Sequence, residues 1–457
     1  MRYVSTRGET SPLSFTEAVV TGLAPDGGLL VPEHIPQVGE QLSDWRALNF
    51  VDLAKRIIRL FVDDIPGETL DELIGRAFST FDHEDIVPFA PLPEQAPVQI
   101  LELFHGPTLA FKDVALQLLG QLFEYILERD NKHLNILGAT SGDTGSAAIA
   151  GVRGLKSVDI FIMYPHGRVS PLQELQMTTV ADANVHCLSV DGSFDDCQTL
   201  MKDIFNDASF KSEYSLGAVN SVNWARVLAQ IVYYGYASLH ARGDGDVSFC
   251  VPTGNFGNVF AGYLAKRMGF PIDKLIVATN SNDILSVFFR TGSYQRGDVH
   301  FTVSPAMDIQ VASNFERFLF YHFDCDATRL REFMTAFSTT GSASVDELPS
   351  EDDFLATAVS EEQTLDAITR MYEQYQYVVD PHTAVGIVAS EQFQTAGPKV
   401  CIATAHPAKF PESVERSVAG VSVRHPTLEA LVDLPSATTR VAADIDAIKN
   451  IIVENSR

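Results

Sequence analysis

The chain has 457 residues, of which 46% are hydrophobic and 20% charged, so we expect a large core divided into two or three domains. Its formal net charge of -26 would repel nucleic acid and anionic membranes, and we expect neither as a partner. The sequence contains no uncharged apolar run of membrane-spanning length and no apolar segment near its start. We therefore expect a cytoplasmic protein.

The cysteines are five scattered residues without a C-x-x-C pair, so the sequence indicates neither a disulfide framework nor a metal site. We expect each of them to be a small buried residue: Cys187, Cys197, Cys250, Cys325 and Cys401.

Residues 1–97 predict a mainly helical region, with helix patterns at 45–61 and 69–78. A strand predicted at 98–104 leads into the segment His105-Gly106-Pro107-Thr108-Leu109-Ala110-Phe111-Lys112-Asp113, and helical spacing follows at 114–127. A lysine with its ordinary pKa of about 10.4 is a poor nucleophile at neutral pH unless burial or a nearby cation lowers that pKa. The apolar neighbours of Lys112 could bury it, whereas a solvated lysine paired with Asp113 is the commoner arrangement.

A strand predicted at 134–139 ends in Thr140-Ser141-Gly142-Asp143-Thr144-Gly145, which opens a helix of small residues. We name residues 140–145 the first glycine loop. Hydroxyl groups and the free N–H groups of a helix N-terminus are suited to bind a carboxylate. Alternatively, Ser141, Asp143 and Thr144 only cap the helix.

Strands and helices alternate over the following residues, which is typical of a parallel α/β sheet. We expect strands at 158–164, 185–190, 246–251, 274–279 and 399–403. We expect helices at 172–178, 197–205, 220–239, 259–268, 355–376 and 384–394, and an irregular insertion with short helices at 280–350.

A second glycine-bearing turn, Gly254-Asn255-Phe256-Gly257-Asn258, follows the strand at 246–251 and precedes a helix. We name residues 254–258 the second glycine loop. Its glycines would let backbone N–H groups approach a phosphate closely, and it matches neither a Walker A loop nor the spaced G-x-G-x-x-G motif. The alternative is a tight turn that needs glycine for its backbone angles.

Together these segments resemble the threonine synthase family of fold-type II pyridoxal phosphate (PLP) enzymes. The matching segments are 3–8 with 24–29, 105–113, 140–145, 254–258, and Thr404-Ala405-His406-Pro407-Ala408-Lys409-Phe410. The resemblance implies an α/β fold with a large and a small parallel-sheet domain and a mainly helical N-terminal region. It implies an N-terminal domain at 1–97, a PLP-binding catalytic region at 98–410 with a smaller subdomain at 105–240, and a C-terminal segment at 411–457 that packs on the catalytic region.

The resemblance also implies roles for individual residues. Lys112 would hold PLP as a Schiff base and act as the base, Thr404 would meet the pyridine nitrogen, and the cofactor phosphate would be cradled by Gly254, Asn255, Phe256, Gly257 and Asn258. The implied substrate is O-phosphohomoserine, converted with water to threonine and phosphate by β,γ-elimination and β-addition. Candidate substrate-binding residues are Thr108, Ser141, Gly142, Asp143 and Thr144, and for the substrate phosphate Arg168, Ser170, Asn223 and Arg226. We identify no second amine at a strand end among these motifs.

Two other functions stay open. The first is a PLP lyase that acts on the same substrate and releases 2-oxobutyrate, and the second is a non-catalytic PLP-fold binding protein. The presence of Lys112, both glycine loops and Thr404 argues against the second. We expect a monomer or a homodimer that binds a small-molecule substrate.

Overall fold

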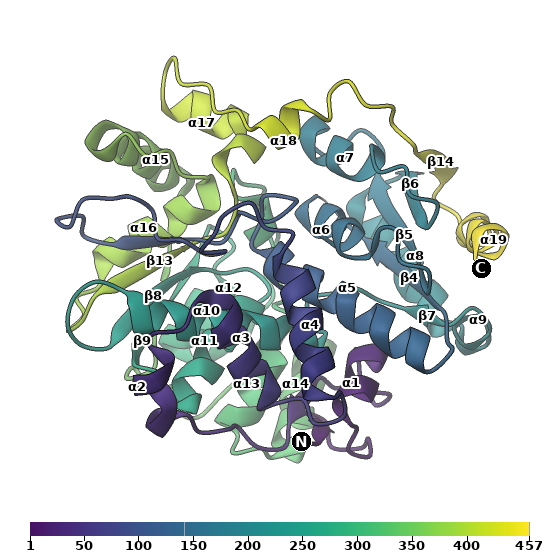
Figure 1. Cartoon of the computed structure of the whole chain (residues 1–457), viewed down its shortest axis with the longest axis horizontal. Helices are drawn as coiled ribbons and strands as arrows, with labels where there is room; N and C mark the ends of the chain where they lie inside the picture. The colour runs from purple at the N-terminus through teal and green to yellow at the C-terminus, as the bar shows by residue number, and fades with distance from the viewer. Residues whose placement is uncertain (141, 457) are drawn as a thin grey trace.

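Two five-stranded sheets organise the computed structural model, which describes residues 1–140 and 142–456 (Figure 1). The first sheet has the order β12-β9-β8-β13-β3, and all its neighbouring strands are parallel. Its strands are mostly buried, as expected when helices cover both faces of a parallel sheet. They are β3 (Gln99–Glu102), β8 (Val247–Pro252), β9 (Ile272–Thr279), β12 (Phe354–Ala358) and β13 (Lys399–Ala403).

Four helices connect or cover these strands: α10 (Trp224–His240), α11 (Gly257–Met268), α15 (Glu361–Tyr375) and α16 (Pro381–Gln392). The expected helix at 355–376 is wrong over its first residues, because 354–358 form β12 beside β9. Helix α15 starts only at Glu361, where Ser360 and Gln363 form a capping box that satisfies the first N–H groups.

The second sheet has the order β14-β6-β5-β4-β7 and is also parallel. Its strands are β4 (Leu134–Ala139), β5 (Val158–Pro165), β6 (Val185–Asp191), β7 (Leu216–Gly217) and β14 (Thr439–Ala442). The helices around it are α5 (Lys112–Arg129), α6 (Asp143–Val152), α7 (Pro171–Thr178), α8 (Phe194–Asn206), α9 (Ala208–Glu213) and α19 (Ile445–Asn455).

The C-terminal segment joins both halves of the molecule. After β13 the chain passes through α17 (Pro411–Ser417) and α18 (Pro426–Glu429), which run across the top of Figure 1 towards α7. Strand β14 then pairs with β6, with Thr439 opposite Leu188. The sequence did not predict this strand, and the division into domains stays a prediction.

The N-terminal region contains the antiparallel strands β1 (Tyr3–Ser5) and β2 (Leu30–Pro32) with helices α1 (Phe15–Thr21), α2 (Leu42–Trp45), α3 (Phe50–Arg59) and α4 (Gly67–Phe78). The single helix expected at 45–61 is wrong, because α2 and α3 are separate. Asn49 begins the second of them by accepting a hydrogen bond from the N–H of Asp52 at 2.9 Å.

The insertion at 280–350 contains short elements, as expected: α12 (Ile284–Thr291), β10 (Ser293–Gln295), α13 (Phe315–His322), α14 (Ala327–Thr340) and β11 (Ser342–Ser344). It is nevertheless part of the core. Phe288 and Phe315 meet edge to face at 4.7 Å between ring centroids, and the fully buried Arg317 donates to the carbonyl of Leu30 in β2. The insertion therefore links the N-terminal region to the first sheet.

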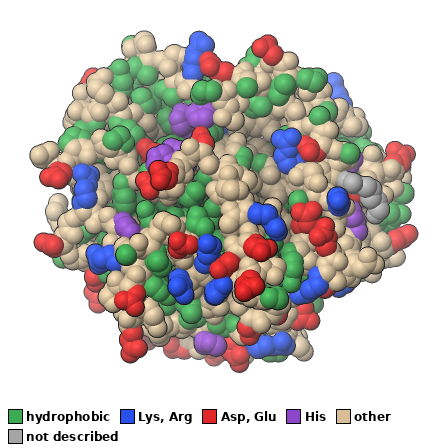
Figure 2. All heavy atoms as spheres, viewed as in Figure 1, with side chains coloured by type: hydrophobic (Ala, Val, Ile, Leu, Met, Phe, Trp, Pro, Cys, Tyr) green, Lys and Arg blue, Asp and Glu red, His purple; other side chains and the backbone are tan. Residues whose placement is uncertain are grey.

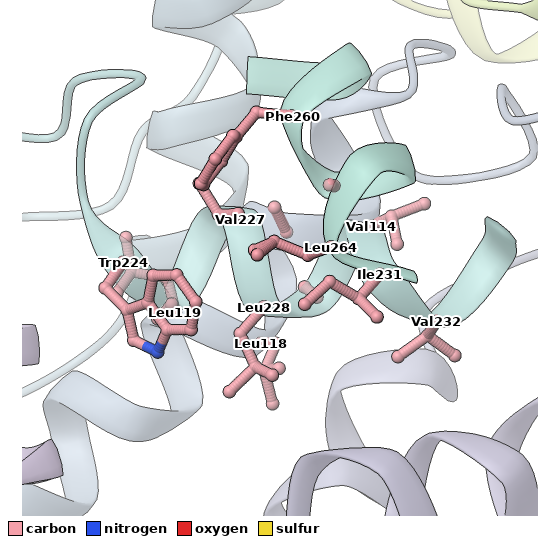
Figure 3. Close-up of a cluster of buried hydrophobic side chains, with 14 of the residues drawn as sticks. Val114, Leu118, Leu119, Trp224, Val227, Leu228, Ile231, Val232, Phe260 and Leu264 are labelled. Carbon is pink, nitrogen blue, oxygen red and sulfur yellow. The ribbon is translucent and has the colours of Figure 1, made fainter. Parts of the chain in front are cut away.

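Helix α10 packs against both α5 and α11 through large apolar side chains (Figure 3). Val114 and Leu118 of α5 and Val227 and Ile231 of α10 belong to one buried cluster, and all of these side chains are almost fully excluded from solvent. Burial of one such side chain contributes about 1.5–3 kcal/mol. This core fixes the first turns of α5 and α10, from which the site described below is built.

Acidic and basic side chains are interspersed on the surface shown in Figure 2. None of the described helices is long and apolar enough to cross a membrane. The cysteines are free, and four are buried as expected. Cys325 is exposed instead, because it lies in the turn between α13 and α14 with a φ of 62°.

Candidate active site

The carboxyl ends of parallel strands lie at one edge of a sheet, and ligands bind there in open α/β folds. The segments that follow β3 and β13 at this edge are hydrogen-bonded to each other. The N–H of Phe111 donates to the carbonyl of Thr404 at 2.8 Å, and the N–H of His406 donates to that of Leu109 at 3.0 Å. The Lys112 segment is thus fixed to the 404–410 segment.

Lys112 is the first residue of α5, and its side chain is 12% exposed. Its Nζ lies 3.6 Å from Oδ2 of Asp143 and 5.6 Å from the centroid of the Phe111 ring. Burial lowers the pKa of Lys112 below its ordinary value; Asp143 acts against this shift, whereas Lys409 and Arg226 add to it. The amine is therefore more readily neutral than that of a surface lysine.

Asp113 is not the partner of Lys112, so the interpretation as a solvated ion pair is wrong. The fully buried Asp113 carboxylate accepts hydrogen bonds from the N–H and the hydroxyl of Thr108, at 2.8 and 2.7 Å. Burial raises the pKa of Asp113 to about 6. The carbonyl of Thr108 accepts from Gln176 and Lys409, so this threonine holds the turn before Lys112 in place. Its role in substrate binding stays a prediction.

In the first glycine loop, the Thr140 side chain caps N–H groups at the start of α6. Its Oγ1 accepts from the N–H groups of Gly142 and Gly145, both at 3.0 Å. Gly142 precedes α6 with a φ of 156°, and a Cβ there would lie 2.6 Å from Oε1 of Gln173. Ser141 lies outside the described residues. Among the residues that are described, the N–H groups of Asp143 and Thr144 have no partner and are free for an anion.

The Asp143 side chain does not cap α6, so for this residue the capping alternative is wrong. Its Oδ1 accepts from Nζ of Lys409 and from Nε2 of Gln173, both at 2.9 Å, and its Oδ2 faces Lys112. Burial alone would raise the pKa of Asp143, but Lys409 and Lys112 hold it well below its usual range. Asp143 is therefore an anion between two lysine side chains.

The second glycine loop leaves its backbone donors free. Within the described part of the chain, none of the N–H groups of residues 254–258 donates to another protein group. Phe256 has a φ of 62°, a conformation that costs a non-glycine residue about 1–2 kcal/mol. Its ring packs on Phe289, Phe315 and Phe318 of the insertion. These contacts fix the conformation of the loop at the start of α11.

Two further features of the second glycine loop fit a bound phosphate. A Cβ at Gly254 would lie 2.6 Å from the carbonyl oxygen of Ala306, so only glycine leaves the backbone this close. Asn258 is buried, and its Oδ1 accepts from the hydroxyls of Tyr233 and Tyr234, each at 2.7 Å, while its Nδ2 has no partner in the described chain. Orphaned buried donors of this kind indicate a missing acceptor.

Thr404 is almost fully buried at the end of β13. Its N–H donates to Oγ1 of Thr383 at 3.4 Å, and Thr383 in turn donates to Asp380. Asp380 also accepts from Nδ1 of His382 at 2.8 Å, while Nε2 of His382 accepts from the N–H of Ala306 at 3.2 Å. Helix α16 therefore supports both Thr404 and the 3-10 helix Pro305–Met307, which lies beside Gly254. These supports were not identified from the sequence.

The four residues proposed for the substrate phosphate differ in their surroundings. Arg226, in the first turn of α10, is 5% exposed, and its Nε and Nη1 have no partner among the described residues. Burial lowers the pKa of Arg226 to about 10. Asn223 caps α10 and donates to the carbonyl of Val19 at 2.8 Å, whereas Ser170 caps α7 and is exposed. Arg168 is exposed in the turn after β5.

Lys409 is the residue that the sequence analysis missed, and the expectation of no second amine at a strand end is wrong. Its side chain is fully buried, and its Nζ binds Asp143 and donates to the carbonyl of Thr108 at 2.7 Å. One signal in the sequence could have identified Lys409 as a site residue: it lies just after the last core strand, within the 404–410 segment. Its partners could not be identified from the sequence, because they are far away along the chain.

Three family models match the chain. They are described as "Threonine synthase N terminus" at residues 2–78, "Pyridoxal-phosphate dependent enzyme" at 92–404 and "Threonine synthase, C-terminal" at 383–452. A threonine synthase of Schizosaccharomyces pombe is 46% identical, over 92% of this chain and 90% of the relative.

Solved structures agree with these matches. A threonine synthase from Brucella melitensis with PLP bound has a TM-score of 0.95 and 43% identity, with both chains covered completely. The yeast threonine synthase has a TM-score of 0.94 and 44% identity, over 99% of this chain and 98% of its own. With the family models, the sequence identity and the fold in agreement, this chain belongs to the threonine synthase family of pyridoxal-phosphate-dependent enzymes.

Proposed function

We propose that the chain catalyses the threonine synthase reaction, the conversion of O-phosphohomoserine and water to threonine and phosphate. We further propose that it does so with PLP as cofactor, in the cytoplasm, as a monomer or a homodimer. Support comes from the family relationship and from a site that combines the buried amine of Lys112 with separate sets of anion donors. A substrate with both a carboxylate and a phosphate needs two sets of anion donors, and the cofactor phosphate needs a third.

The observation that carries the proposal is the unpaired guanidinium of Arg226. Leaving buried N–H groups without acceptors costs about 1–3 kcal/mol, and more for a charged group. A stable protein keeps such an arrangement where a ligand supplies the acceptors. Arg226 is close enough to Lys112 to lower the pKa of that amine. A phosphate dianion suits the planar guanidinium, which donates two parallel hydrogen bonds.

The donors described above fit PLP. The free N–H groups of the second glycine loop and Nδ2 of Asn258 would hold its phosphate, the Thr404 hydroxyl would meet its pyridine nitrogen, and Lys112 would bind it through the amine. When bound, PLP supplies an electron sink that makes protons near the substrate amino group removable. The neutral hydroxyl of Thr404 does not force protonation of the pyridine nitrogen, so positioned protein groups must direct the proton transfers.

The protein groups then act on named atoms of the substrate. The N–H groups of Asp143 and Thr144 bind the carboxylate, and Arg226 binds the γ-phosphate. Lys112 removes the proton from Cα, which its lowered pKa favours, and returns a proton there at the end. Loss of a proton from Cβ then expels the γ-phosphate. A proton adds at Cγ to form the methyl group, and water adds its hydroxyl at Cβ before the proton returns to Cα.

Product analysis tests the proposed reaction. The purified holoenzyme is incubated with O-phosphohomoserine, and threonine, 2-oxobutyrate and inorganic phosphate are quantified. We expect threonine and phosphate in equal amounts. Release of 2-oxobutyrate in place of threonine would identify a phospho-lyase, and absence of turnover in a protein that binds PLP would identify a binding protein.

A pair of arginine variants tests the phosphate assignment. Arg226→Ala is expected to lower kcat/KM for O-phosphohomoserine by an amount equivalent to about 2–5 kcal/mol, as when a buried charge partner is truncated. PLP content should not change. Arg168→Ala is the matched control, with a smaller loss expected because this side chain is exposed. Wild-type kcat/KM in the Arg226 variant would contradict the assignment.

A further inference from the structure

The second buried lysine of the site, Lys409, contacts the first glycine loop from a position that the backbone fixes. It ends the short 3-10 helix Pro407–Lys409, whose first turn is capped by His406, which accepts from the N–H of Ala408 at 3.1 Å. Its ammonium group is held between the carbonyl of Thr108 and the carboxylate of Asp143. The segment after β13 thereby connects the turn before Lys112 to the start of α6.

Lys409 binds Asp143 more closely than Lys112 does, at 2.9 Å compared with 3.6 Å. A buried carboxylate forms its strongest interaction with the cation that satisfies it by direct hydrogen bonds. The remaining hydrogen bond to Oδ1 comes from Gln173. Asp143 is thus already compensated on one side, and its attraction for the Lys112 amine is weakened.

We propose that Lys409 is a positioning residue of the reaction: by occupying Asp143, it keeps the Lys112 amine available for nucleophilic attack and proton transfer. Without Lys409, Asp143 would have Lys112 as its only close cationic partner among the described residues, and the ion pair would hold this amine protonated. The identity of the reaction rests on the proposed function, but the arrangement of charges does not.

The direction of the effect follows from every charged group that faces the pair. Lys112 faces Asp143, Lys409 and Arg226, and Asp143 also faces His382. Removing Lys409 deletes a cation that lowers the pKa of Lys112 and also frees an anion that raises it. Both changes have the same sign, so the pKa of Lys112 must rise and its neutral fraction at a given pH must fall.

The test measures the reactivity of Lys112 itself. In the full-length protein freed of cofactor, the rate of Lys112 acetylation by acetic anhydride is followed against pH by mass spectrometry. For Lys409→Met we expect the midpoint pH to rise by about one unit, which lowers the rate about tenfold below the midpoint. Lys409→Arg should restore most of the difference, because it keeps the positive charge.

Lys399→Met is the matched control. Lys399 begins β13, the strand that precedes the Lys409 segment, and within the described chain it donates to the carbonyls of Ser390 at 2.6 Å and Phe393 at 3.2 Å. The Lys112 midpoint should therefore stay unchanged. In the holoenzymes, the pH profile of kcat should shift upward for Lys409→Met and not for the control.

Several outcomes would overturn the inference. A wild-type midpoint in Lys409→Met, even with reduced turnover, would reduce Lys409 to a structural role. If circular dichroism shows that Lys409→Met is unfolded, Asp143→Asn decides instead: removing the anion should lower the midpoint, and an unchanged value would contradict the argument. None of these labelling measurements uses the substrate, so failure of the proposed reaction would be seen separately in the product analysis.

Discussion

The two glycine loops have the same plan, a parallel strand followed by a glycine-bearing turn and a helix, yet they differ in chemistry. The N–H groups of the second loop have no partner in the described part of the chain, and this loop contributes no charged side chain. The first loop satisfies two of its N–H groups with Thr140 and places the Asp143 carboxylate between two lysines. We therefore propose that the second loop is a rigid anion receptor and that the first loop sets the charge of the reactive amine. Their common sequence pattern does not distinguish these roles.

Replacing the amine next to the first loop should have the largest effect. Lys112→Ala is expected to fold and to retain PLP noncovalently through the second loop, but to lose about 10²- to 10⁴-fold or more in kcat, as when a positioned proton-transfer group is removed. Lys409 should not replace Lys112, because Asp143 and the Thr108 carbonyl hold its ammonium group. Borohydride reduction followed by peptide mapping checks this: a cofactor adduct on Lys409 with normal turnover would contradict the comparison.

A side chain added to the second loop should have the opposite effect, lowering PLP affinity and leaving kcat unchanged. Gly254→Ala places a Cβ 2.6 Å from the backbone oxygen of Ala306, and overpacking of this kind costs about 1–3 kcal/mol. We expect PLP affinity to fall while kcat at saturating PLP stays near the wild-type value. Gly75→Ala in α4, which has open space at that position, is the control. Equal PLP affinity in both variants, measured by fluorescence titration, would show that the loop does not hold the cofactor.

The smallest effect is expected for Thr404, which we propose to meet the pyridine nitrogen of the cofactor. Thr404→Val keeps the backbone bonds to Phe111 and Thr383 and removes only a hydroxyl, so the fold should persist. Loss of one hydrogen bond is worth about 0.5–1.5 kcal/mol in PLP affinity or in the barrier to proton transfer. Thr439→Val on the exposed strand β14 is the control. If Thr404→Val changes neither PLP affinity nor rate, Thr404 is not part of the site.

Local signals in the sequence were sufficient for most elements near the site. The buried strands β4, β5, β8 and β13 were predicted from continuous apolar runs, and the loops after them from glycine and polar residues. The break between α2 and α3 and the strand β12 were missed, because a helix cap or a strand partner decided them. Such competition between local patterns is settled by partners elsewhere in the chain.

The sequence by itself determined the alternation of strands and helices, the two glycine loops and Lys112 as the candidate reactive amine. Only the tertiary structure decided that Asp113 binds Thr108, that Asp143 binds Lys409 and Lys112, and that Arg226 is buried without a partner. Apolar periodicity and turn residues act over a few neighbours, so they can be recognised in the sequence. The charge state of a buried amine depends on desolvation and on ions brought together by folding. Both depend on which residues are close in the folded structure, and not on which are close in the sequence.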